Sequence, residues 1–158
     1  MTRLIALVAT LAAAGLVADV AAAQTAGDWA QFRGPSGSGV ADDQKPPIEF
    51  GPDKNVKWKT SVPAGMSSPI VIGDLIVLTA FENHKLFTIA YRRTDGMEAW
   101  RAESPAKEIE RFHKTEGSPA ASTCVTDGKH IVSYFARVAS FVTMRRGSSS
   151  GNTNCRRR

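Results

Sequence analysis

The sequence is poor in residues that build metal sites and disulfide frameworks. Its 158 residues include two cysteines, Cys124 and Cys155, which could pair once in an oxidising compartment. The three histidines, His84, His113 and His130, are too dispersed to show metal-ligand spacing. His84 and His130 are expected to be surface residues at a turn and at a strand start. We therefore assign no catalytic residue and no metal ligand.

The sequence contains only one long apolar run, and it lies at the N-terminus. Arg3 precedes LIALVATLAAAGLV, and alanines 21–23 precede Gln24. A charged residue, a short apolar run and small residues in this order are typical of a secretory signal peptide. A membrane anchor is the alternative, but the run is shorter than the roughly 20 residues that span a bilayer, and Asp19 interrupts its end. We expect a signal peptide at 1–23, a periplasmic or secreted chain, and no transmembrane segment after cleavage.

The body of the chain has almost no net charge. Residues 24–135 hold 13 Lys or Arg and 14 Asp or Glu, although the whole chain carries +5. Six arginines follow Phe135, so the basic character belongs to residues 136–158. This tail lacks the interleaved aromatic residues of a surface that stacks on bases. We expect no nucleic-acid partner, and a tail that binds nucleic acid or anionic lipid is the alternative.

Motifs for phosphate binding and nucleophilic catalysis are also missing. GPSGSG at residues 34–39 lacks the Lys-Ser/Thr ending of a phosphate loop, and no nucleophile elbow occurs. Residues 24–54 are dense in Gly, Pro and Asp without a sustained period, which predicts a turn-rich lead-in that crosses a surface. Trp29 and Phe32 are expected to pin this lead-in onto the rest of the protein.

What the sequence does contain, from residue 55 onward, is the apolar pattern of β-strands. NVKWKTSV alternates apolar and polar residues, which predicts a strand over 55–62. SPIVIGDLIVLTAF predicts two strands around Gly73-Asp74, and KLFTIAY and MEAWRA predict two more, joined at Thr94-Asp95-Gly96. PAKEIERFHK is the only candidate helical turn. Its charged residues are expected to form a solvated insertion, with a channel-facing role as the alternative.

The β pattern then repeats. SSPIVIGDLIVLTAF and GSPAASTCVTDGKHIVSYF share a Ser-Pro opening, a strand, a Gly-Asp or Asp-Gly turn and a second strand, and Pro69 and Pro119 lie 50 residues apart. Such a period is typical of a four-stranded propeller blade with a short insertion. Trp58 and Trp100 end apolar strands at matching places. We predict that these rings fill wedges between neighbouring sheets rather than stack on a cofactor.

These stretches resemble the pyrroloquinoline-quinone-like (PQQ-like) β-propeller repeat proteins that bacteria export. The resemblance rests on WAQFRGPSGSGV, NVKWKTSVPAGMSSPIVIGDLIVLTAF and YRRTDGMEAWRAE, and it covers residues 28 to about 135. It implies blades that run from a Ser-Pro strand to a Gly-x-x-x-Trp strand, here Gly96 to Trp100, in a closed ring. The expected fold is all-β, with PQQ-like repeats over 55–135 that form an incomplete propeller of four-stranded antiparallel blades. One blade would be full and its two neighbours partial.

The resemblance implies two functions of different classes. Some members of the family are quinone-dependent dehydrogenases of alcohols or sugars, and others bind partners or assist envelope assembly. No residue here matches a quinone or calcium ligand of the dehydrogenases, so we expect no cofactor in this chain, whereas longer relatives include PQQ enzymes. We expect a truncated, non-enzymatic binding or scaffold module of the bacterial envelope, and the sequence names no partner, an envelope protein being the candidate. A fragment of a periplasmic dehydrogenase is the alternative. The residues expected to matter are structural: Trp58, Pro69, Gly96, Trp100 and Pro119.

Residues 136–158, ARVASFVTMRRGSSSGNTNCRRR, break the pattern. We expect this tail to be unstructured and out of frame, through loss of one nucleotide just after the codon of Phe135. Read one base out of register with permissible codons, it becomes SCGVVCYDAEGKLVWEHKLPPP. The codon of Cys155 leaves no freedom, because after either codon of Asn154 it forces a leucine. The alternative is a natural, disordered basic tail.

The shifted string completes the second repeat. It contains Glu-Gly followed four places on by Trp, the spacing that Gly96 and Trp100 show. The distance from Pro119 to that Trp exceeds the distance from Pro69 to Trp100 by a single place. The written frame completes no repeat.

Overall fold

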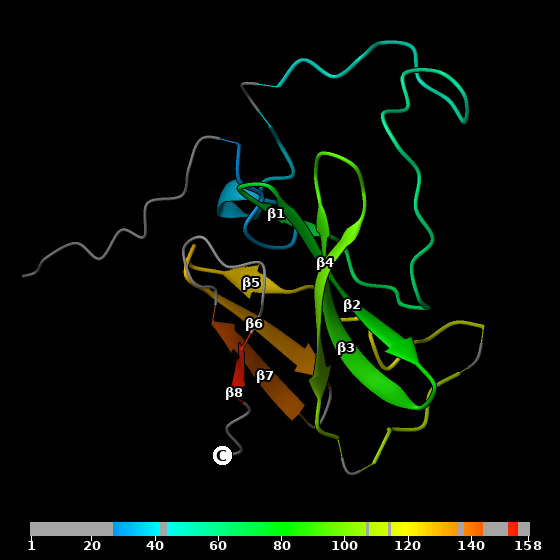
Figure 1. Ribbon diagram of the computed structural model, residues 1–158, viewed down its shortest axis with the longest axis vertical. Coiled ribbons are helices and arrows are strands. Elements are labelled where there is room, and N and C mark those ends of the chain that lie inside the picture. Colours follow the sequence, from blue (N-terminus) through cyan, green and yellow to red (C-terminus); the bar gives the residue numbers. More distant parts are fainter. Residues whose placement is uncertain are drawn as a thin grey trace, which may run out of the picture.

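The chain folds into two antiparallel β-sheets (Figure 1). This computed structural model describes residues 27–41, 44–106, 108–113, 115–135, 138–143 and 152–154. The first sheet contains β1 (Ile70–Ile72), β2 (Leu75–Glu82), β3 (Lys85–Arg92) and β4 (Glu98–Ser104). The second sheet contains β5 (Val125–Thr126), β6 (His130–Phe135), β7 (Val138–Thr143) and β8 (Asn152–Asn154).

Each sheet is a meander in which strands that follow one another in sequence are paired. Among the described residues the only helix is a single short 3₁₀ turn, η1 (Pro35–Gly37), so the all-β expectation is confirmed. The two described sheets form an open stack, and they do not close into a ring (Figure 1).

The strands of the first sheet form where the sequence predicts them. β1 and β2 are joined by Gly73 and Asp74, with Ile72 paired to Leu75. β2 and β3 are joined by Asn83 and His84, whose φ angles of 50° and 60° are left-handed. Left-handed residues at both central positions match the right-handed twist of a two-residue hairpin.

Two predicted elements are absent from the described residues. Residues 55–62 form no strand, and the helical turn expected around 105–114 is not formed by the described residues there. Alternating polarity makes a segment suitable for a sheet, but a strand also needs a neighbour that accepts its backbone hydrogen bonds. Within the described structure, residues 55–62 have no such ladder partner.

β7 and β8 lie within the tail that was expected to be unstructured. β7 pairs with β6 along its whole length, from His130 opposite Thr143 to Phe135 opposite Val138. The physical reason is local, because VASFVT is rich in β-branched and aromatic residues and β6 would otherwise present an unpaired edge. The other residues of 136–158, and the expected signal peptide at 1–23, lie outside the described residues.

The structural repeat is longer than the spacing of the two Ser-Pro pairs, which corrects the period inferred from the sequence. In the first sheet Ile70 pairs with Val77 and Val71 with Ile76. The same register recurs in the second sheet, where Val125 pairs with Val132 and Thr126 with Ile131.

Val125 is therefore the counterpart of Ile70. Pro69 directly precedes β1, whereas residues 120–124 separate Pro119 from β5. The two prolines do not occupy equivalent positions, and the hydrogen-bond register rather than the Ser-Pro pairs defines the repeat.

One face of the first sheet packs against the second sheet. Paired residues of adjacent strands share a face, so this covered face carries Val77, Thr79, Thr88, Ala90 and Trp100. These five side chains are buried.

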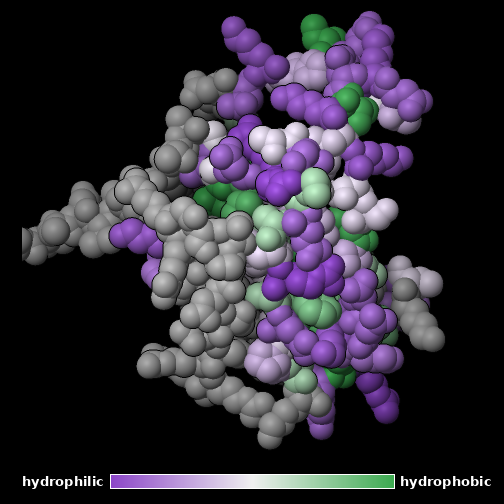
Figure 2. Space-filling model, in the orientation of Figure 1, coloured by the Kyte–Doolittle hydropathy of each residue, from purple (hydrophilic) through white to green (hydrophobic). Residues whose placement is uncertain are grey.

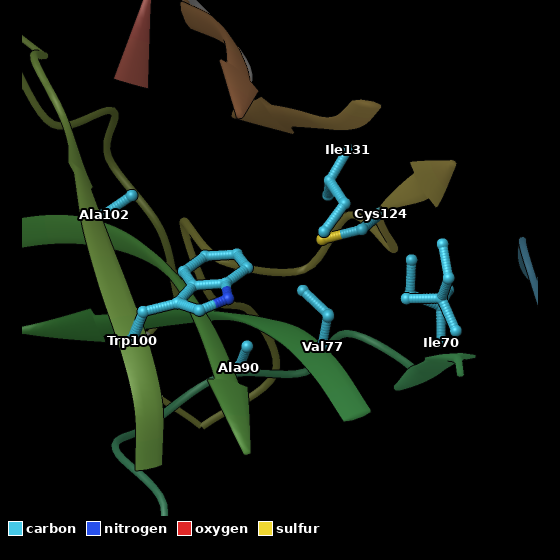
Figure 3. Close-up of a cluster of buried hydrophobic side chains, with 8 residues drawn as sticks. Ile70, Val77, Ala90, Trp100, Ala102, Cys124 and Ile131 are labelled. Carbon is cyan, nitrogen blue, oxygen red and sulfur yellow. The ribbon is translucent and has the colours of Figure 1, made fainter. Parts of the chain in front are cut away.

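Cys124, which directly precedes β5, and Ile131 of β6 join Trp100 in one core cluster with Ile70 and Val77 (Figure 3). The oxygen atoms Oγ1 of Thr88 and Oγ of Ser133 share a hydrogen bond of 2.7 Å across the interface. The two sheets thus share one hydrophobic core with a buried polar contact.

The lead-in ties the two sheets together at their first strands. Trp29 exchanges two backbone hydrogen bonds with Val71 of β1, at 2.7 and 3.0 Å. The next carbonyl, that of Ala30, accepts a hydrogen bond from the Thr126 amide of β5. A carboxylate oxygen of Asp28 accepts the amide of Gly73 at 2.8 Å. Three successive residues therefore fasten β1 and β5.

The Trp58 ring packs against Gly96 at the turn between β3 and β4. Its indole Nε1 donates a 2.9 Å hydrogen bond to the carbonyl of Arg93. A methyl group at Gly96 would overlap the Trp58 ring, and the φ angle of Gly96 is 71°. Gly96 is therefore required both for its left-handed conformation and for the space that it leaves.

We predict that Gly96→Ala destabilises the protein by about 2–3 kcal/mol. Left-handed strain costs about 1 kcal/mol or more, and displacement of the ring adds an overpacking cost of about 1–3 kcal/mol. Gly73→Ala is the matched control, since Gly73 has a φ of 52° and open space around it. Urea unfolding should show a clearly larger loss for Gly96→Ala than for Gly73→Ala, and equal losses would contradict the contact.

On the face shown in Figure 2, the described residues are mainly polar, with apolar side chains scattered among charged ones. The most exposed large apolar residues lie in the lead-in, where Ile48 is 98% and Phe50 80% exposed. Within the described part of the chain, no helix has the length and apolar character needed to cross a membrane.

Candidate functional site

The loop that connects β4 to β5 lies beside the tip of the β2–β3 hairpin (Figure 1). Of this loop, residues 105–106, 108–113 and 115–124 are described. Phe81 joins the loop to the hairpin, since its ring packs edge-on against Phe112 at a centroid distance of 5.5 Å. His84 packs edge-on against the Phe81 ring, at a centroid distance of 6.1 Å. We call Phe81, His84 and Phe112 the aromatic cluster.

The connecting loop is held on the sheets by apolar contacts. Ala106 and Ile109 pack against a buried cluster of Leu86, Ala120 and Phe135. This anchor lies between the sheets and presents the following residues outward. Phe112 is 38% exposed, and the Nδ1 atom of His113 shares a 3.0 Å hydrogen bond with the hydroxyl of Thr115. The loop therefore combines a fixed base with an accessible aromatic edge.

Charged residues lie close to Phe112 in the sequence of the same loop. Glu108, Glu110, Arg111 and Glu116 are all exposed. Among the described residues, no three His, Cys, Asp or Glu side chains converge as a metal site. Exposed aromatic residues beside charged ones occur in many protein contact surfaces, where the aromatic ring supplies buried area and a polar rim surrounds it.

The side chains of His130 and Asp127 share a hydrogen bond in the hairpin between β5 and β6. The Nδ1 atom of His130 and the Oδ2 atom of Asp127 are 2.9 Å apart. The other carboxylate oxygen accepts the backbone amides of Lys129 at 2.8 Å and His130 at 2.6 Å. The His130 side chain and these amides hold the pKa of Asp127 well below its ordinary value. Both oxygens of the Asp127 carboxylate form hydrogen bonds with groups of the same turn. We therefore assign this carboxylate a structural role.

Asp127→Ala should destabilise the protein by about 1–2 kcal/mol, since it removes both amide contacts. Asp127→Asn keeps an amide acceptor and should cost less. The lowered pKa means that the carboxylate contributes stability above its unfolded pKa of about 4, and that this contribution is lost as the pH falls through the folded value. The difference in unfolding free energy between wild type and Asp127→Asn should therefore stay constant down to about pH 5 and shrink as the pH falls below about 4. A difference that stays constant below about pH 4 would contradict these contacts of the carboxylate.

The one cysteine that the structure describes, Cys124, is buried in the core shared by the two sheets. Its Sγ atom shares a 3.3 Å hydrogen bond with the hydroxyl of Ser133. Burial raises the pKa of the Cys124 thiol to about 11. A thiol that is protonated at neutral pH and closed to solvent makes a poor nucleophile. Cys124 is a free thiol, and Cys155 lies outside the described residues.

An ion network covers the aromatic residues on the other face of the first sheet. Arg101 contacts Glu82 at 2.9 Å and Glu98 at 2.7 Å, and its guanidinium lies 5.3 Å from the centre of the Phe87 ring. The hydrogen bonds from Arg101 lower the pKa of Glu98. Burial, with a smaller effect of Glu98, raises the pKa of Tyr91. The polar groups of this network bind one another over the face of the sheet, so we assign the network a structural role.

The residues singled out from the sequence lie at four separate places. Trp100 is buried between the sheets, and Trp58 packs on Gly96 at the β3–β4 turn. Pro69 is exposed just before β1, and Pro119 is buried where the loop reaches the second sheet. The structure therefore brings Trp58 and Gly96 together and keeps the other three apart.

The aromatic cluster is the feature that sequence reasoning missed. Phe81 lies near the end of β2, and Phe112 follows two further strands, β3 and β4, in a segment that was expected to be a solvated insertion. The spacing of Ile109 and Phe112 indicated a small apolar face, but no local pattern names Phe81 as its partner.

The Gly-rich segment carries no phosphate site. The amides of Gly34, Gly37, Ser38 and Gly39 donate to the carbonyls of Gln31, Gly34, Pro35 and Arg33 at 2.7–3.1 Å. These donors close successive turns, so they do not converge on an anion as a phosphate loop requires.

Comparison with known proteins gives no relative on which to base an identity. No family model matches the chain, and no curated protein or solved structure matches it.

Proposed function

We propose that the chain is an exported, PQQ-like β-propeller module that binds an envelope protein and has no enzymatic activity. The observation that carries this proposal is the pair of four-stranded antiparallel meanders, whose first hairpins share one register and whose buried residues form one core. Stacked four-stranded meanders are the unit of a propeller. The Gly96-to-Trp100 segment, which resembles the end of a blade in that family, forms the start of β4 and its preceding turn.

The aromatic cluster is the surface that we assign to partner binding. Phe112 offers an exposed aromatic edge on a loop anchored by Ile109, and Glu108, Glu110 and Arg111 flank it. Such a surface suits a folded protein or an extended peptide better than a small molecule, which needs a concave site.

Site-specific photo-crosslinking tests this assignment in the bacterial envelope. A photoreactive residue at position 112 should capture one discrete envelope protein, and Phe81→Ala, which removes the support of Phe112, should weaken that capture. The same photoreactive residue at position 48 is the matched control, because Ile48 is 98% exposed and lies in the lead-in. Equal crosslinking from both positions would argue against the surface.

A fragment of a quinone-dependent periplasmic dehydrogenase is the second candidate, and it rests on the same resemblance. We expect no oxidation of alcohols or sugars, with or without added pyrroloquinoline quinone and Ca²⁺. The ligands of a central site come from many blades, and two sheets supply few of them. Dye-linked turnover that depends on the added quinone would reverse the order of the two candidates.

A further inference from the structure

Three residues of the lead-in lie across the first strands of both sheets. We call Asp28, Trp29 and Ala30 the strap, which runs antiparallel to β1 at Val71. The strap binds the edges of β1 and β5 through one carboxylate oxygen, one backbone amide and two backbone carbonyls. It therefore takes the place of a neighbouring strand at both edges.

The edges beneath the strap present a fixed set of backbone groups. Val71, Gly73 and Thr126 each donate an amide to the strap, at 3.0, 2.8 and 3.0 Å. The Val71 carbonyl accepts the Trp29 amide at 2.7 Å. An unpaired strand edge binds extended peptides through groups of this kind. β1 and β5 thus build a peptide site, and the chain's own residues fill it.

Little apolar surface holds the strap in place. Ala30 is 6% exposed, but the Trp29 ring packs on Gly34, within the lead-in itself. In the described part of the chain, neither Trp29 nor Ala30 belongs to a buried apolar cluster. Residues 31–33, which follow the strap, are exposed. Segments with few buried apolar contacts open at a lower free energy than the core, so the strap can leave while the sheets stay folded.

We propose that the edges of β1 and β5 form a binding site for an extended peptide of another protein, and that the strap closes this site by occupying it. The strap defines the chemistry of the occupant. Its carboxylate accepts the Gly73 amide, and the residue two places on must be small because Ala30 is buried. The site should bind extended peptides in which an acidic residue stands two places before alanine or glycine. It consists of other residues than the aromatic cluster and is independent of the proposed function.

Occupation by the strap should make peptide binding weaker in the wild type than in a chain whose strap is displaced. The apparent dissociation constant rises by the reciprocal of the open fraction, so a strap closed in about 99% of the molecules weakens binding about 100-fold. Ala30→Glu displaces the strap, because the closed strap would bury the new charge. This substitution leaves every group of β1 and β5 in place.

Fluorescence anisotropy with a labelled peptide of residues 24–33, QTAGDWAQFR, measures this difference. The Ala30→Glu chain should bind the peptide about 10- to 100-fold more tightly than the wild type. Ile48→Glu is the matched control, since it adds the same charge at an exposed position of the lead-in, and it should bind as weakly as the wild type.

Two altered peptides test the contacts themselves, without any change to the protein. A peptide with Ala30→Glu should not bind. A peptide that is N-methylated at the Trp29 amide lacks the donor to the Val71 carbonyl, and it should bind much more weakly than the unmodified peptide.

Circular dichroism and protection of the Cys124 thiol show whether the Ala30→Glu chain is folded. If it is unfolded by itself, the added peptide should restore Cys124 protection in a saturable manner, because a ligand that binds only the folded state stabilises that state. Equal affinities of the wild type and Ala30→Glu, a peptide that neither binds nor restores protection, or undiminished binding of either altered peptide would each overturn the proposal.

Discussion

With the substitution Trp100→Ala, most of the protein molecules are expected to be unfolded at neutral pH. Trp100 is only 8% exposed and lies between the sheets, against Ala90, Cys124 and Ile131 (Figure 3). Removal of a buried Trp costs about 3–5 kcal/mol, and a typical domain has only about 5–15 kcal/mol of stability. A stack of two sheets that share one core belongs at the lower end of that range.

The thiol of Cys124 reports this unfolding. In a Cys155→Ser background Cys124 is the only cysteine, and burial protects it from thiol reagents. Trp100→Ala should make it react at the rate of an unfolded chain, whereas Trp100→Phe, which keeps an aromatic ring, should retain most of the protection. Unchanged protection in Trp100→Ala would show that the two sheets do not depend on this ring.

Restoration of one nucleotide after the codon of Phe135 is expected to stabilise the second sheet strongly. In the written frame, β8 is Asn-Thr-Asn and brings no aromatic residue to the place where β4 brings Trp100. The shifted string supplies VVCYD to pair with β6 and then a Trp at the end of the repeat. A buried Trp contributes about 3 kcal/mol or more, so the urea midpoint should rise markedly.

Insertion of three nucleotides at the same place is the control, because it adds one residue and keeps the written frame. It should leave the midpoint unchanged. Sequencing of the gene through this region is the direct test, since the codon choices behind the shifted string are then known. An intact frame with the same arginine codons in an independent isolate would end the proposal, as would a restored chain that is no more stable.

The strands from 70 to 104 were predictable because their information is local. Runs such as LIVLTAF and KLFTIAY combine β-branched and aromatic residues, and Gly73-Asp74 and Asp95-Gly96 mark the turns. The failure at 55–62 has the opposite cause. NVKWKTSV has the alternating apolar and polar residues of a strand. Whether another strand lies beside it to form backbone hydrogen bonds depends on the rest of the fold.

The candidate site was less predictable than the strands. The contacts of Phe81 with Phe112, and of Trp58 with Gly96, join residues that lie far apart in the chain. The sequence pattern can indicate that such apolar residues will be buried, but it does not show which residue each of them contacts.

The repeat length was misjudged for a related reason. Pro69 and Pro119 look equivalent in the sequence, because each follows a serine and precedes a strand. The hydrogen-bond register instead makes Val125 the counterpart of Ile70, and this register becomes visible only when the strands are paired.

The sequence by itself determined that this protein is built from β-hairpins, with turns at Gly73, Gly96 and Gly128, because alternation and turn chemistry act over a few residues. Only the tertiary structure decided which face of each sheet is covered. Val77 and its counterpart Val132 are chemically identical, yet one is completely buried and the other is partly exposed. Burial depends on what packs against a residue, and that packing is a property of the whole chain rather than of its local pattern.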